Sequence, residues 1–168
     1  GIALGVLGID AEPPRATPYL WIGVPEGHDS ASFTGLVLDQ AAVIVSPDLG
    51  NTKKARNMAE RLDAPLAIIE KRRVGNRDKS EVLNLIGSVE GCTAILFDDE
   101  IDTAGSICQA VDVCVENGAT DVYAAATHGV LSGPAIERLQ KSPVREVILT
   151  NSISIPDEKR IDKISDKD

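Results

Sequence analysis

The chain has 168 residues, enough for one domain with a full core or for one domain with an extension. Hydrophobic residues make up 43% of it and aromatic residues 3%, so the core has to be built from Val, Ile, Leu and Ala. The formal net charge of −9 disfavours nucleic-acid binding because phosphates repel an acidic chain, and no apolar run approaches the roughly 18 residues of a membrane span.

The cysteines are three in number, Cys92, Cys108 and Cys114, and they lack the paired spacing of a metal site. Each stands in an apolar or helical context, so we expect reduced thiols, which are typical of a cytoplasmic protein. Residues 1–8 are apolar but have no basic flank, unlike a signal peptide. The sequence does not begin with methionine, and we therefore expect a fragment or a processed chain.

The first forty residues contain four prolines and match no regular pattern, whereas strands and helices alternate from residue 41 onward. In chain order the pattern predicts a strand over 42–45, a helix over 52–62, strands over 66–69, 82–86 and 94–97, a helix over 105–117 closed by Gly118, a strand over 122–126, a helix over 133–140 and a strand over 147–150. Residues 71–80 are polar and predict a loop, and the charged residues 156–168 predict a frayed tail. The alternation predicts an α/β fold with a parallel sheet flanked by helices on both faces.

Polar turns follow three of these strands, at 46–51, 71–79 and 98–106. Ligands of parallel sheets bind at the carboxyl ends of the strands, which lie at one edge of the sheet. We therefore expect the three turns to converge on one site.

The turn at 98–106 carries the strongest signal for a ligand. Asp before a helix is often only an N-cap, but here Asp98, Asp99 and Asp102 fall within five positions. Clustered carboxylates repel one another, and a bound cation or a hydroxyl ligand is the simplest compensation. Gly105 allows close approach of the backbone to an anion, and a helix N-terminus favours phosphate. This stretch predicts a sugar-phosphate site.

Two other segments fit a phosphate site less specifically. The basic residues from Lys71 to Lys79 would ordinarily be a solvated loop, but in an acidic chain they can instead close over a polyphosphate. The turn at 46–51 is either a plain turn in which Asn51 caps the helix, or a diphosphate loop in which Asp48 binds a metal. His128 follows a strand, and we expect a hydrogen-bonded structural role for it and no chemistry.

Together these motifs resemble the ribose-phosphate pyrophosphokinase family, the PRPP synthetases, from about Val43 to about Lys159. The similar stretches are 45–48, 69–73, 97–106, 123–135 and 150–153. The resemblance implies a phosphoribosyltransferase-like fold and a reaction in which the diphosphoryl group of ATP passes to the C1 hydroxyl of ribose 5-phosphate, giving PRPP and AMP. It also implies Mg²⁺ as cofactor and a homo-oligomer.

The resemblance assigns roles by position. Catalytic roles fall on Lys71 and Arg73, and magnesium binding falls on Asp48. Ribose-phosphate binding falls on Asp98, Asp99, Asp102, Thr103, Ala104, Gly105 and Ser106. Departures from the family pattern are Asn51 for glycine, Lys54 for the commoner arginine, Glu100 for an apolar residue and Ser106 for threonine.

The resemblance divides the chain into a poorly matching segment 1–40, a ribose-phosphate domain 41–155 and the tail 156–168. It covers the carboxyl-terminal half of the family, so we expect this chain to need a partner domain for the ATP side of the reaction. Two alternatives stay open: a non-catalytic module that regulates synthetases, and a phosphoribosyltransferase that consumes PRPP.

Overall fold

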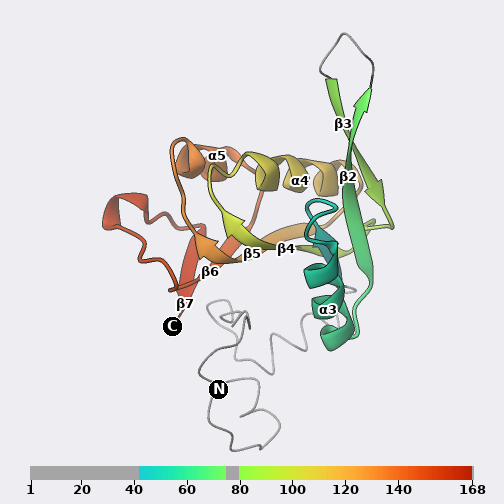
Figure 1. The fold of residues 1–168 in the computed structure, drawn as a ribbon, viewed down its shortest axis with the longest axis horizontal. Coiled ribbons are helices and arrows are strands. Elements are labelled where there is room, and N and C mark those ends of the chain that lie inside the picture. Colours follow the sequence, from blue (N-terminus) through green and yellow to red (C-terminus); the bar gives the residue numbers. More distant parts are fainter. Residues whose placement is uncertain (1–41, 75–79, 168) are drawn as a thin grey trace, which may run out of the picture.

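The computed structural model describes residues 42–74 and 80–167 (Figure 1). The elements are β1 (Ala42–Ser46), α3 (Thr52–Leu62), β2 (Leu66–Val74), β3 (Ser80–Ile86), β4 (Thr93–Ile101), α4 (Gly105–Glu116), β5 (Asp121–Gly129), α5 (Ala135–Lys141), β6 (Glu146–Thr150), the 3₁₀ turn η1 (Asp157–Lys159) and β7 (Ile164–Lys167). The expectations for residues 1–40, and for the tip of the basic segment at 75–79, lie outside the described residues.

The strands of the described part form one sheet in the order β3-β2-β1-β4-β5-β6-β7. All neighbouring pairs are parallel except β2 with β3, which is antiparallel. Helices α4 and α5 cover one face of the sheet and α3 covers the other (Figure 1). The predicted α/β fold, a parallel sheet flanked by helices, is confirmed.

The core is aliphatic, as the composition predicts. Continuous apolar runs such as Val43-Ile44-Val45 are buried because helices cover both faces of the central strands. Phe97 is the aromatic residue buried among the described positions, and it packs with Ala55 and Ala59 of α3. Cys114 lies in the opposite cluster, where burial raises the pKa of its thiol to about 12.

The prediction of a loop over 71–80 is wrong in its outer parts. Strand β2 continues to Val74, and its residues Ile68–Val74 pair with Ser80–Ile86 in an antiparallel hairpin that projects beyond the rest of the sheet (Figure 1). Pairing with β3 satisfies the backbone of Lys71–Val74, so the polar side chains do not end the strand. Such pairing is not visible in hydrophobic periodicity.

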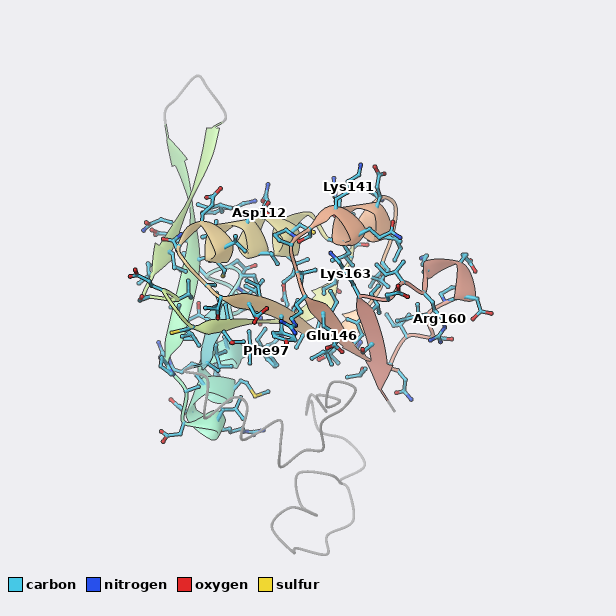
Figure 2. All side chains as sticks on the ribbon, turned by 180° about the vertical axis from the view of Figure 1, so that it is seen from behind. Phe97, Asp112, Lys141, Glu146, Arg160 and Lys163 are labelled. Atoms are coloured by element: carbon cyan, nitrogen blue, oxygen red, sulfur yellow. The ribbon has the colours of Figure 1, made fainter. Side chains whose placement is uncertain are left out.

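The prediction of a frayed tail over 156–168 is also wrong, because β7 pairs in parallel with β6. Ile155 is buried, and Ile161 and Ile164 pack against the same core. Lys163 Nζ donates hydrogen bonds to the main-chain oxygens of Leu139, Gln140 and Ser142, at 3.5, 3.2 and 2.6 Å, at the carboxyl end of α5 (Figure 2). Because most residues of the tail are charged, its composition does not indicate these few anchoring residues.

Candidate functional site

A polar cavity of about 330 Å³ lies at the carboxyl ends of β1 and β4. Its lining residues are Asp48, Asp98, Asp99, Glu100, Ile101, Asp102, Thr103, Ala104, Gly105, Ser106 and Ile107. Two of the three turns expected to converge, at 46–51 and 98–106, therefore do so. Lys71 is not among the lining residues, and Arg73 is described only as a position in β2.

The aspartate pair does not lie in a turn, as the sequence predicts, but in a strand. Strand β4 runs to Ile101, and Asp98 and Glu100 stand opposite Ala126 and His128 of β5. The turn begins only at Asp102. The strand holds the carboxylates at fixed positions over the cavity, which a flexible turn would not do.

Asp98 is partly buried, and its carboxyl has a perturbed acidity. Burial raises its pKa to about 7, helped by the hydrogen bond with the Asp99 side chain and by the negative charges of Asp99 and Asp48. Its Oδ1 accepts a hydrogen bond from the main-chain N–H of Asp99 at 2.8 Å, which acts in the opposite direction. The net effect is a carboxyl that changes charge near neutral pH and gains from a cation or from hydroxyl donors.

The pKa of Asp99 is shifted in the opposite direction, downward. Lys54 Nζ on α3 donates to its Oδ2 at 2.6 Å, and this bond holds the pKa of Asp99 below its usual range. Both side chains are about half exposed, at 55% and 53%. Two adjacent aspartates thus differ in ionisation because one faces a lysine and the other is buried beside carboxylates.

The turn after β4 leads into a helix whose first turn faces the cavity. Ala104 precedes α4 in the left-handed conformation, with φ of 57°, and no described side chain caps the helix. The first N–H groups of a helix have no acceptor within it, and here they belong to the cavity-lining residues Gly105, Ser106 and Ile107. With the hydroxyls of Thr103 and Ser106, they make a suitable cradle for a phosphate.

Hydrogen bonds from α5 and from the loop that precedes it support the turn after β4. Arg138 Nη1 on α5 donates to the main-chain oxygen of Thr103 at 2.9 Å, and a Cβ on Gly105 would stand 3.2 Å from the same Nη1. The hydroxyl of Ser132 donates to Asp102 Oδ1, and the main-chain N–H of Ser132 donates to the oxygen of Asp102 at 2.9 Å. The sequence analysis assigned no role to Arg138 or Ser132, because their contacts span about thirty residues and leave no local pattern.

The loop after β1 is fixed by its own polar groups. Ser46 Oγ donates to the main-chain oxygen of Asp48 at 2.7 Å, and Asp48 Oδ1 accepts the main-chain N–H of Asn51 at 2.8 Å. Asn51 stands at the N-cap position of α3, as that alternative has it, but its side chain does not cap the helix: Nδ2 donates to the main-chain oxygen of Phe97. His128 is hydrogen-bonded as expected, through Nδ1 to Ser152 Oγ at 2.8 Å.

The donor chemistry of the cavity fits a magnesium ion. Carboxylates are ligands that Mg²⁺ prefers, and the cavity is lined by the carboxylates of Asp48, Asp98 and Asp99. Among the described residues, no group of three or more side chains forms a complete metal cage.

The fold is that of the phosphoribosyltransferases and the PRPP synthetases. An adenine phosphoribosyltransferase structure matches with a TM-score of 0.52 and 14% identity, over 71% of this chain and 73% of that one, which shows the fold alone. The phosphoribosylpyrophosphate synthetase of Mycobacterium smegmatis matches with a TM-score of 0.71 and 42% identity, over 81% of this chain and 45% of that chain. In the part that the structure describes, no helix is long and apolar enough to cross a membrane.

Residues 73–167 match the model of the phosphoribosyl synthetase-associated domain, and the chain belongs to that family. A ribose-phosphate pyrophosphokinase of Bacillus cereus is 51% identical over 168 residues, which cover 96% of this chain and 52% of the relative. The chain thus spans about half the length of the curated relatives it matches. The resemblance predicted from the motifs is confirmed.

Proposed function

We propose that this chain is the ribose-phosphate-binding half of a ribose-phosphate diphosphokinase. The observation that carries the proposal is the cavity in which the carboxylates of Asp48 and Asp98 face the first turn of α4. One wall offers acceptors for sugar hydroxyls and the other offers donors for a phosphate. The identity to ribose-phosphate pyrophosphokinases supports the same substrate, ribose 5-phosphate.

In this proposal the sugar lies between the strand and the helix. Asp98 and Asp99 accept hydrogen bonds from the ribose hydroxyls, and the 5-phosphate rests on residues 102–106. Thr103 and Ser106 add hydroxyl donors to the main-chain N–H groups. Arg138 donates to the main-chain oxygen of Thr103 and acts through the shape of the turn.

The reaction joins the C1 oxygen of the sugar to the β-phosphorus of ATP. The bond between the α- and β-phosphates breaks, AMP leaves, and the C1 hydroxyl loses its proton. Such transfers depend on positioning and charge neutralisation. Asp48 would hold Mg²⁺, and the bound ion would supply charge neutralisation for the diphosphoryl group. Lys71 and Arg73 of β2 supply further positive charge.

The ATP side and the assembly are also part of the proposal. The match to about half of the relatives' length supports a division in which the adenine side lies on another domain. We also propose that the protein is a homo-oligomer and works in the cytoplasm, where ATP and ribose 5-phosphate are found.

A regulatory module that binds ribose 5-phosphate without catalysis is the second candidate. Glu100 favours it, because this exposed carboxylate lines the cavity and adds negative charge near the proposed phosphate position. The candidates differ in activity: only the diphosphokinase forms AMP from ATP and ribose 5-phosphate.

Titration calorimetry of this chain with ribose 5-phosphate in magnesium tests the shared part of both candidates. We expect saturable binding that Asp98→Ala abolishes. No heat of binding to ribose 5-phosphate or PRPP would refute the proposal. An AMP-release assay with the chain joined to the amino-terminal half of a relative then separates catalysis from regulation.

A further inference from the structure

We propose that Asn51 is a positioning residue that sets the spacing between the carboxylates of Asp48 and Asp98 across the cavity. The inference rests on the proposed function for its consequence, ribose 5-phosphate binding. Its structural content, the spacing itself, does not depend on that function.

Asn51 makes one hydrogen bond to each side of the carboxylate pair. Its main-chain N–H donates to Asp48 Oδ1 at 2.8 Å, which orients that carboxylate. Its side-chain Nδ2 donates to the main-chain oxygen of Phe97, the residue directly before Asp98 in β4. A single residue therefore connects the carboxylate of the β1 loop to the strand that carries the other.

Both ends of this connection are anchored in the core. Asn51 is only 5% exposed, and Phe97 is 7% exposed and packs in the cluster beneath α3. The strands β1 and β4 are paired in the sheet, but this pairing ends at Val45 and Leu96, before either carboxylate. Beyond it, the ion pair of Lys54 with Asp99 also connects the two segments, and its side chains are half exposed and screened by solvent. The bond from Asn51 is the buried side-chain contact beyond the paired strands, so we expect it to set the local spacing of the two carboxylates.

The two polar atoms of the Asn51 side chain affect stability in opposite directions. Asn51 Oδ1 is buried and has no hydrogen-bond partner among the described residues, which is unfavourable. Asn51→Ala removes this atom, but it also takes the donor from the main-chain oxygen of Phe97. We therefore expect a loss of stability together with a freer loop after β1, and affinity has to be compared in variants shown to be folded.

Asn117 provides a matched control. Its Nδ2 donates to the main-chain oxygen of Val113 at 2.8 Å, at the carboxyl end of α4 and away from the cavity. Asn117→Ala removes the same type of bond. Asn51→Leu keeps the branched shape of the side chain, in a larger form and without the donor, and it serves if the alanine variant fails to fold.

The test is calorimetry with ribose 5-phosphate at saturating magnesium, together with thermal unfolding. Loss of a residue that orients binding groups typically weakens affinity by about tenfold or more, and we expect this for Asn51→Ala and Asn51→Leu but not for Asn117→Ala. Unchanged affinity in the folded Asn51 variants would overturn the inference.

If the wild-type chain binds no ribose 5-phosphate, the proposed function fails on its own account. Crystal structures of wild type and Asn51→Leu then decide the inference. A changed separation of the Asp48 and Asp98 carboxylates supports it, and an unchanged separation overturns it.

Discussion

The raised pKa of Asp98 makes the stability of the chain depend on pH in a defined window. The carboxyl titrates near 3.8 when unfolded and near 7 when folded. Between these values the folded chain holds a proton that the unfolded chain has lost, so stability falls as pH rises from about 4 to about 7. The full shift corresponds to about 4 kcal/mol, and solvent screening at this partly exposed side chain reduces the expected effect to about 2 kcal/mol.

Asp98→Asn removes this penalty. Urea unfolding at pH 5 and pH 8 should show the variant gaining about 1 kcal/mol on wild type between the two pH values, because part of the penalty is already present in wild type at pH 5. Asp112→Asn on the outer side of α4 is the control, which retains the wild-type dependence (Figure 2). Magnesium should stabilise wild type more at pH 8 than at pH 5, because a cation favours the ionised carboxyl. An equal pH dependence in wild type and Asp98→Asn would refute the reasoning.

Two further substitutions test the supports of the site and of the fold. Arg138→Ala removes the donor to the main-chain oxygen of Thr103. Calorimetry should show affinity for ribose 5-phosphate about tenfold lower, and unchanged affinity would mean that the turn does not need this support. Lys163→Ala removes the donor to the main-chain oxygens at the carboxyl end of α5, and it should lower the free energy of unfolding by about 1 kcal/mol. Amide exchange in β7 should become faster. Equal exchange in the variant and in wild type would show that the isoleucines alone hold the tail.

Much of the architecture could be predicted because its signals are local. Buried strands such as Ile95-Leu96-Phe97 are continuous apolar runs, which is typical of parallel strands covered on both faces. Gly118 ends α4 as predicted, with a φ of 85° that suits glycine. The topology was also enough to place Asp48 near Asp98, since Asp48 follows β1 and Asp98 lies toward the carboxyl end of β4, its parallel neighbour in the sheet.

The features that the sequence did not predict depend on contacts between residues distant in the chain. Lys71–Val74 are strand residues only because β3 pairs with them, and Ile164 is in a strand only because β6 offers an edge. The contacts of Arg138 and Ser132 with the turn likewise need the packed structure. Their side chains are ordinary polar groups in the sequence, and nothing in their own segment indicates which atoms they will meet.

The cavity is built almost entirely by one continuous segment. All its lining residues except Asp48 belong to Asp98–Ile107, the end of one strand and the start of the next helix. The position of this segment depends on the central strands β1 and β4 and on the hydrogen bonds from Arg138 and Ser132, and none of the lining residues belongs to the edge strands β3 and β7. Insertions or losses at β3 or β7 would therefore leave its walls intact, and the same segment could be carried by sheets of different widths.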